Sequence, residues 1–287
     1  MDPCNRRTRF RDILHGSRAV FPGSVYDPLS ARIAEDLGFE AGMFAGSIAS
    51  FTVLGAPDII VLTLTEFAQQ AHRICRAGEL PLVVDADHGY GNAMNVKRTV
   101  EELETAGIAC MTIEDTVLPA PFGATGTTLV PVEEGIGKMK GALAGRSDPK
   151  LVILGRTSAV SINGVDDAIA RGKAYLDAGV DGVTFIGVKT REQLETIAAA
   201  IDAPIMLGGT PPELQDLDYL SECGVRICLQ GHQPFAAAVK AMHDTLKALR
   251  EGTAPGDLKG VASAELMKRV TRAADYGRMT KDFLDSE

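Results

Sequence analysis

The sequence predicts an α/β fold: a (β/α)8 barrel of the TIM type with extra C-terminal helices. Two observations lead to this prediction. Short apolar runs recur along the 287 residues, and most lack alternating polarity, which is typical of strands buried on both faces. Between them lie segments with apolar residues three and four positions apart, the spacing of amphipathic helices. Eight such units of fairly even length favour a closed barrel over an open, doubly wound sheet.

The eight apolar runs are the expected strands. They are rich in Val, Ile, Leu, Met and Cys, and a loop and a helical pattern follow most of them, as βα units require. In chain order the runs are Ala19–Phe21, Ala41–Ala45, Leu82–Asp85, Cys110–Glu114, Leu151–Arg156, Gly182–Ile186, Pro204–Leu207 and Val225–Leu229.

The helical patterns alternate with these strands. We expect four helices to end at a glycine in the left-handed conformation, which turns the chain back into the sheet. The patterns are Leu29/Ile33/Leu37, Val96/Val100/Leu103, Leu194/Ile197/Ile201 and Val239/Met242/Leu246/Leu249, and the glycines are Gly38, Gly107, Gly179 and Gly224. We assign residues 1–250 to the barrel and residues 251–287 to a helical extension that packs on the barrel or on a neighbouring subunit.

Composition excludes several classes of function. Asp and Glu (38) outnumber Lys and Arg (29), which gives a formal net charge of −9. Such a chain has no general attraction for nucleic acid or for an anionic membrane, so we expect neither partner. The polar, basic first residues lack the apolar core of a signal peptide. Five cysteines without a CxxC motif fit reduced thiols in the cytoplasm.

Acidic side chains gather where the expected strands end, which is where (β/α)8 barrels hold their active sites. Asp85 and Asp87 follow the third strand, Glu114 ends the fourth, and Asp58 lies in the loop after the second. Carboxylates crowded at one mouth raise one another's pKa unless a divalent cation compensates them. Oxygen ligands favour a hard ion, so we expect Mg2+, with Mn2+ as the alternative.

Three further features suit an anionic substrate. Arg156 ends an apolar strand, and a buried guanidinium needs an anionic partner, either a substrate carboxylate or a nearby acid. Ser47, after Gly46 at the end of the second strand, offers a hydroxyl and backbone N–H groups to a carboxylate. His232 follows the eighth strand as a candidate substrate contact or proton donor, because the ordinary pKa of histidine, ~6.5, suits proton transfer near neutral pH.

Structural roles compete with these functional ones. Asp87 and Glu114 would otherwise cap the helices that follow them. We expect Asp115 to cap a helix or form a structural ion pair, and His88 to be a structural histidine.

Several stretches resemble the phosphoenolpyruvate mutase/isocitrate lyase superfamily. The similarity runs from about residue 20 to residue 235, with the motifs in the family's order and spacing. The stretches are Pro22–Ala31, Ala45–Ser47, Gly55–Asp58, Asp85–Asn92, Ile113–Asp115 and Arg156–Thr157. This resemblance implies a (β/α)8 barrel, usually a tetramer that exchanges its last barrel helix between subunits, together with Mg2+ and α-keto acid substrates.

The resemblance also implies roles for individual residues. Asp85 would be the direct metal ligand. The residues that would hold metal-bound waters are Asp58, Asp87 and Glu114, and those that would bind the substrate's carboxylate end are Gly46, Ser47 and Arg156.

The loop after the fourth strand identifies the branch. Lyases of the family carry a cysteine there within a Lys/Arg-rich motif, and phosphonate enzymes carry a Lys and an Asn. Residues 119–128 contain none of these. The loop and the Gln230–His232 ending are similar to the oxaloacetate decarboxylase branch. The resemblance thus implies Mg2+-dependent decarboxylation of oxaloacetate, or of a C3-substituted oxaloacetate, to pyruvate and CO2 through a metal-stabilised enolate. Asp85, Arg156 and His232 would be catalytic, in a homotetramer.

Three other functions stay open at this point. The first is a carbon–carbon lyase of the methylisocitrate type, or a phosphonopyruvate-processing enzyme, of the same superfamily. The second is a Schiff-base aldolase that uses Lys189, the one Lys near the C-terminal end of an expected strand. The third is a sensor that binds a keto acid without turning it over.

Overall fold

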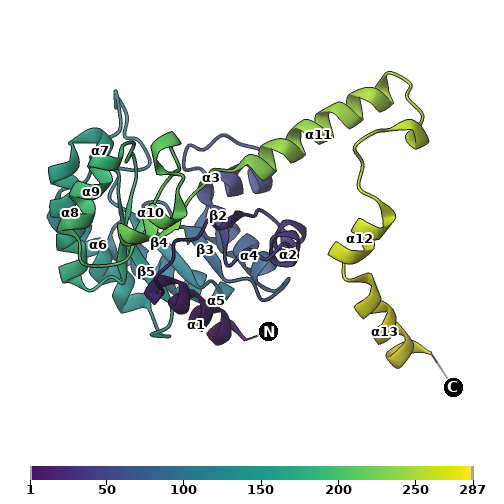
Figure 1. Ribbon diagram of the computed structural model, residues 1–287, viewed down its shortest axis with the longest axis horizontal. Helices are drawn as coiled ribbons and strands as arrows, with labels where there is room; N and C mark the ends of the chain where they lie inside the picture. The colour runs from purple at the N-terminus through teal and green to yellow at the C-terminus, as the bar shows by residue number, and fades with distance from the viewer. Residues whose placement is uncertain (1, 286–287) are drawn as a thin grey trace. The chain divides into compact units, whose positions relative to one another are not determined.

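The computed structural model describes residues 2–285. Eight parallel strands, surrounded by helices, form the centre of its first part, which ends at Gly231 (Figure 1). The strands pair in chain order. They are β1 (Gly23–Ser24), β2 (Gly42–Ala45), β3 (Leu82–Asp85), β4 (Cys110–Glu114), β5 (Val152–Thr157), β6 (Gly182–Phe185), β7 (Ile205–Leu207) and β8 (Val225–Cys228). Val20 forms a parallel bridge with Ile227 in β8, so the sheet curls until its two ends meet. The predicted α/β fold is confirmed, with an arrangement consistent with a TIM-type barrel.

The first strand differs from its prediction. Ala19–Phe21 was expected, whereas β1 comprises Gly23–Ser24, and Val20 contributes only the isolated bridge to β8. The N–H of Gly23 donates to the carbonyl oxygen of Ala41 (2.9 Å), so β1 bonds β2 instead. Pro22 separates the two halves, because it has no N–H to donate to either neighbour.

Helices precede the first strand and alternate with the strands along the chain. In the first part of the chain they are α1 (Pro3–His15), α2 (Pro28–Asp36), α3 (Gly46–Ala49), the π-helical turn η1 (Ser50–Leu54), α4 (Leu64–Cys75), α5 (Ala93–Ala106), α6 (Val132–Gly145), α7 (Ala159–Ile162), α8 (Val165–Ala178), α9 (Arg191–Ala200), the 3-10 turn η2 (Pro212–Leu214) and α10 (Leu217–Glu222). As predicted, α5 and α8 end at Gly107 and Gly179, whose φ angles are 93° and 107°.

Helix α1 packs against the interior of the sheet. Its Phe10 and Leu14 are buried among inward-facing side chains of the strands, such as Leu154. Arg7, buried on the same helix, donates from Nε to the carbonyl oxygen of Ile108 (3.0 Å) just ahead of β4. Its Nη1 is ion-paired with Asp148 (2.8 Å). Because α1 covers the N-terminal ends of the strands, the C-terminal ends are left for the site.

The chain divides into two compact units, one ending at Gly231 and the other beginning at His232. The second unit contains α11 (Gln233–Arg250), the 3-10 turn η3 (Pro255–Asp257), α12 (Ala264–Val270) and α13 (Ala273–Leu284). Helix α11 falls in the second unit, and the predicted boundary of the barrel at residue 250 stays a prediction. Among the described residues of α11 none is buried, and its apolar stripe, Val239, Met242, Leu246 and Leu249, is exposed.

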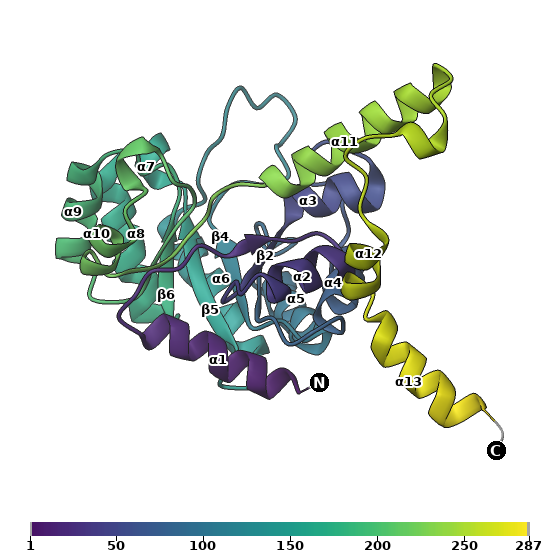
Figure 2. The same cartoon turned by 45° about the vertical axis from the view of Figure 1, so that its right-hand side comes forward.

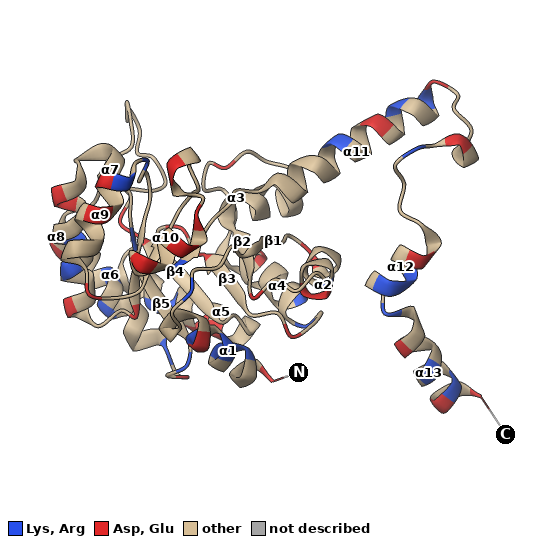
Figure 3. Cartoon of the chain, viewed as in Figure 1, with Lys and Arg blue, Asp and Glu red and all other residues tan. Residues whose placement is uncertain are grey.

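Charged residues of both signs are interspersed along the outer helices (Figure 3). Between Asp2 and Asp285, no helix has both the length and the apolar character needed to cross a lipid bilayer.

We predict that Arg7→Met lowers the free energy of unfolding by about 3 kcal/mol, because it leaves a carboxylate and backbone carbonyls without their buried donor. Urea unfolding followed by circular dichroism measures this change. Arg9→Met is the matched control, since Arg9 is exposed and donates to one carbonyl, that of Glu79. Equal losses in the two variants would contradict a special role for Arg7.

Candidate active site

Asp85 is the last residue of β3, and the turn after it brings Asp87 back to the same end of the barrel. The hydroxyl of Thr112 on β4 donates to Oδ1 of Asp85 (3.0 Å), and the N–H of Asp87 donates to the same oxygen (3.3 Å). Asp87 has a φ of 49°, in the left-handed region that a non-glycine residue rarely adopts. Such strain is typical of functional sites, where surrounding contacts hold the backbone in place.

Arg156, near the end of β5, joins two of the acids. Its Nη1 is ion-paired with Oδ2 of Asp85, and its Nη2 lies 3.1 Å from Oε2 of Glu114. Glu114 also accepts from the hydroxyl of Thr116 (3.0 Å). Burial lowers the pKa of Arg156, but Asp85 and Glu114 more than offset it, so the net shift is upward and the guanidinium stays charged.

Asp87 is a buried carboxylate with other acids beside it. Its pKa is raised well above the ordinary value, first by burial and then by the charges of Asp85 and Glu114. Gly46, the first residue of α3, lies against this carboxylate: a Cβ built on Gly46 would come within 2.4 Å of Oδ2 of Asp87. Only glycine therefore fits at position 46 without displacing the acid. Burial likewise raises the pKa of Glu114.

Asp115, the residue after Glu114, belongs to a different network. Its Oδ2 accepts from the hydroxyl of Tyr175 (2.7 Å) and is ion-paired with Nη1 of Arg171 (3.2 Å), both on α8. The same Nη1 donates to the carbonyl oxygen of Val130 (3.0 Å). The prediction that Asp115 forms a structural ion pair agrees with these contacts.

The remaining predicted residues differ in where they lie. Ser47 is half-buried in α3, directly after Gly46. Asp58 is exposed in the loop after η1, close enough to add to the upward shift in the pKa of Asp87. His232 immediately precedes α11 in the second unit, so its role in this site stays a prediction.

Helix capping does not explain the acids. The cap of α5 is Asn92, whose Oδ1 accepts from the N–H of Met94 (2.9 Å), and the residue before α6 is Pro131. Neither Asp87 nor Glu114 therefore has the capping role that competed with metal binding.

Two groups of residues near the site were missed from the sequence. Arg171 and Tyr175 sit one turn apart on α8, and both face the sheet. Lys138 on α6 is 3% exposed, and its Nζ donates to the carbonyl oxygen of His88 (2.9 Å). The sequence did contain a signal for Lys138, because it shares the buried face of α6 with Gly135 and Met139, positions that an amphipathic helix normally fills with apolar residues.

His88 is buried, and burial together with Lys138 lowers the pKa of its ring to about 4.

A long loop projects from the end of β4 (Figure 2). Its stem is held by an antiparallel bridge between Thr116 and Leu129, and residues 119–128 are exposed. Phe122 at its tip is fully exposed. The sequence of this loop contains no Cys, Lys or His, so it offers no ionisable group to a ligand at the mouth.

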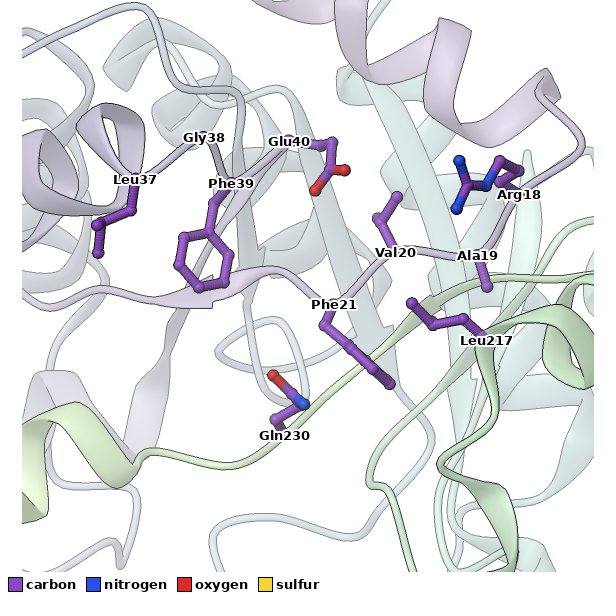
Figure 4. Close-up of a pocket in the computed structure, with 10 residues that line it drawn as sticks. All are labelled: Arg18, Ala19, Val20, Phe21, Leu37, Gly38, Phe39, Glu40, Leu217 and Gln230. Atoms are coloured by element: carbon purple, nitrogen blue, oxygen red, sulfur yellow. The ribbon is translucent and has the colours of Figure 1, made fainter.

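A cavity of about 370 Å³ lies elsewhere in the first unit (Figure 4). The lining of this cavity comprises Arg18, Ala19, Val20, Phe21, Leu37, Gly38, Phe39, Glu40, Leu217 and Gln230. None of the predicted metal or carboxylate-binding residues is among them, so this cavity is not the acidic mouth.

The acidic group suits a cation held mainly through water. Among residues 2–285, no three His, Cys, Asp or Glu side chains converge closely enough to ligate one ion directly. Mg2+ typically takes one or two carboxylates and keeps several waters, so a single direct ligand with further acids around it needs no such convergence.

A parallel α/β barrel with carboxylates and an arginine at the C-terminal ends of its strands has the architecture of an enzyme of the TIM-barrel type. The family model for phosphoenolpyruvate phosphomutase matches residues 10–250. The chain therefore belongs to this family.

Curated relatives match nearly the full length. A protein of Bradyrhizobium diazoefficiens named oxaloacetate decarboxylase is 61% identical over 280 residues, covering 98% of this chain and 97% of the relative. One of the same name from Rhodopseudomonas palustris BisB18 is 58% identical over 280 residues, with the same two coverages.

Solved structures have the same fold. Oxaloacetate acetylhydrolase in complex with 3,3-difluorooxalacetate has a TM-score of 0.86 at 27% identity, covering 98% of both chains. Phosphonopyruvate hydrolase, in complex with oxalate and Mg2+, has a TM-score of 0.85 at 25% identity, covering 97% of this chain and 99% of its own.

We predict opposite outcomes for two buried threonines at this site. Thr112 and Thr184 are each 1% exposed, but Thr112 bonds Asp85, whereas the hydroxyl of Thr184 has no hydrogen-bond partner among residues 2–285. Thr112→Val should lower the free energy of unfolding by about 2 kcal/mol, while Thr184→Val should leave it unchanged or raise it. Urea unfolding measures both, and equal destabilisation would refute the assignment.

Proposed function

We propose that this protein decarboxylates oxaloacetate, or a C3-substituted oxaloacetate, to pyruvate and CO2 with the help of a divalent cation, Mg2+ or Mn2+. The near-full-length relatives named oxaloacetate decarboxylase support the reaction. The family relative that binds oxalate and Mg2+ supports the cation, because oxalate resembles the two oxygens of a 2-oxo acid. We place the reaction in the cytoplasm, in keeping with five thiols, all of them free.

One observation carries the proposal: three buried or half-buried carboxylates, Asp85, Asp87 and Glu114, meet at the mouth beside Arg156. Burial raises the pKa of both Asp87 and Glu114, and the charge of Asp85 adds to the rise in each. A hard divalent cation fits this donor set, since carboxylate oxygens are the ligands it prefers. Asp85 would hold it directly, and Asp58, Asp87 and Glu114 would hold its waters.

The side chains of the mouth bind and orient the substrate. Arg156 donates to the carboxylate at the keto end, and Ser47 with the backbone at Gly46 contacts the same carboxylate. A divalent ion held by these acids would supply positive charge that stabilises the negative charge growing on the keto oxygen as the carbon–carbon bond breaks. Only stabilisation of that developing charge beyond the stabilisation of the ketone accelerates the step.

Bond cleavage itself provides the electrons. The pair from the bond between C3 and the departing carboxylate moves toward the keto carbon and leaves the enolate of pyruvate, so no strong base is needed. The enolate carbon then takes a proton from water or from His232. A loop without ionisable groups fits this chemistry, and it disfavours the lyase and phosphonate reactions.

We predict that Asp85→Ala abolishes the reaction. Loss of the direct ligand removes about 4 kcal/mol of stabilisation of the developing enolate, which corresponds to a fall in kcat on the order of 10³-fold. The assay incubates the pure protein with Mg2+ and oxaloacetate and measures pyruvate with a coupled dehydrogenase. EDTA should remove the activity of the unaltered protein in the same way.

Two further variants test the roles of individual residues in this reaction. Asp166→Ala changes an exposed acid on α8 and should keep full activity. His232→Ala should slow turnover and leave Mn2+ binding intact, because it acts on the proton and not on the cation. The proposal fails if the unaltered protein forms pyruvate no faster than Mg2+ alone. Product formation from methylisocitrate or phosphonopyruvate would instead favour the other branches of the family.

We further propose a homotetramer in which the last barrel helix and the C-terminal extension pack on neighbouring subunits. The exposed apolar stripe of α11 needs a partner. A second exposed stripe runs along α2, at Leu29, Ile33 and Leu37. The cavity of Figure 4, with the apolar side chains of Phe21 and Leu217, offers a hollow for such packing.

We expect light scattering to give a mass of four chains. Leu246→Lys, in the middle of the α11 stripe, should reduce that mass, whereas Lys240→Ala on the same helix should not. A monomer for the unaltered protein would contradict this assembly.

A further inference from the structure

The loop that carries Asp87 is strained and needs external support. Asp87 and Tyr90 have φ angles of 49° and 62°, and Gly89 between them has 75°. Non-glycine residues in this region are strained, and they persist only when neighbouring contacts hold them in place. The contacts that hold this loop therefore fix where the Asp87 carboxylate lies.

Three consecutive carbonyl oxygens of the loop are held by three different elements. That of Asp87 accepts from the N–H of Glu114 on β4 (2.9 Å). That of Gly89 accepts from the hydroxyl of Thr99 on α5 (3.0 Å). Between them, the carbonyl of His88 accepts from Nζ of Lys138 on α6 (2.9 Å).

Lys138 is an unusual choice for such a contact. Lysine is almost never fully buried, because an ammonium loses its hydration there. Glycines let α6 lie directly against α5 and so bring Lys138 under the loop: a Cβ on Gly141 would come within 2.3 Å of the carbonyl oxygen of Ala93. Burial lowers the pKa of Lys138, and the nearby acids Glu134 and Glu114 offset part of this shift.

We propose that Lys138 is a positioning residue that holds the Asp87 carboxylate at the metal-binding mouth by clamping the carbonyl oxygen of His88. The inference rests on the cation site of the proposed function. A lysine makes the clamp stiffer than a neutral donor does, since hydrogen bonds from charged groups are roughly twice as strong.

The direction in which the cation affinity changes distinguishes a positioning role of Lys138 from a purely electrostatic one. Removing a positive charge near an acidic site should tighten cation binding, because one repulsive charge is gone. Removing a clamp should weaken cation binding, because Asp87 is no longer held toward the ion. A purely structural lysine would change the melting temperature and leave the affinity of the folded protein unchanged.

The experiment titrates the full chain, without substrate, with Mn2+ and measures the free ion by electron paramagnetic resonance well below the melting temperature. For Lys138→Met we expect the Mn2+ dissociation constant to rise on the order of 10-fold. Lys138→Gln keeps a donor without the charge and should fall between Met and the unaltered protein. In turnover assays, Lys138→Met should need more Mg2+ for half-maximal rate, while kcat at saturating Mg2+ stays near that of the unaltered protein.

Thr99→Val is the matched control, since it removes the neighbouring clamp at Gly89, two residues beyond Asp87. It should lower the melting temperature and weaken Mn2+ binding less than Lys138→Met does.

Equal weakening of Mn2+ binding by both variants, or Mn2+ binding by Lys138→Met that is unchanged or tighter, would overturn the proposal. If the Met variant does not fold, the Gln variant decides by the same criterion. Failure of the unaltered protein to bind Mn2+ would refute the cation site as well, whereas binding without pyruvate formation would refute only the proposed reaction.

Discussion

Negative charge concentrated at one end of the barrel is the constraint on which the rest of the structure depends. Asp85, Asp87 and Glu114 come from two adjacent strand ends, and Arg156 is ion-paired with the first and the last of them. Buried carboxylates that outnumber their positively charged partners repel one another and lose hydration. Packing contacts must therefore hold these side chains in place. Two local features follow from this constraint. The backbone of Gly46 lies close to the Asp87 carboxylate, and Asp87 adopts a left-handed backbone conformation.

Strand geometry sorts the acids into two groups. Glu114 and Asp115 are consecutive at the C-terminal end of β4, and consecutive side chains of a strand point to opposite faces of the sheet. Glu114 therefore turns to Arg156 in the barrel, whereas Asp115 turns outward to Arg171 and Tyr175 on α8. Arg171 also binds the carbonyl of Val130, at the base of the long loop. A structural ion pair thus anchors the loop without adding charge to the mouth.

Sequence reasoning predicted what depends on local pattern. The strands other than the first lie close to the predicted runs, because buried parallel strands require unbroken apolar residues. It placed Asp85, Asp87, Glu114 and Arg156 together, since the C-terminal ends of parallel strands meet at one mouth. The split of the first strand at Pro22 was missed, and so was the contact from Lys138 to His88, which joins residues 50 positions apart. Such a contact depends on how closely two helices approach, which no periodicity encodes.

The same charge balance explains why the loop after β4 carries no ionisable residue. A lyase must remove or deliver a proton at a defined carbon, so it needs a positioned acid or base above the substrate. In decarboxylation CO2 leaves without the bonding pair of electrons, and in the proposed reaction the negative charge collects on the keto oxygen. A cation in the loop would instead stabilise the departing carboxylate in the ground state and raise the barrier. An uncharged loop is therefore what this reaction favours, and residues 119–128 supply one.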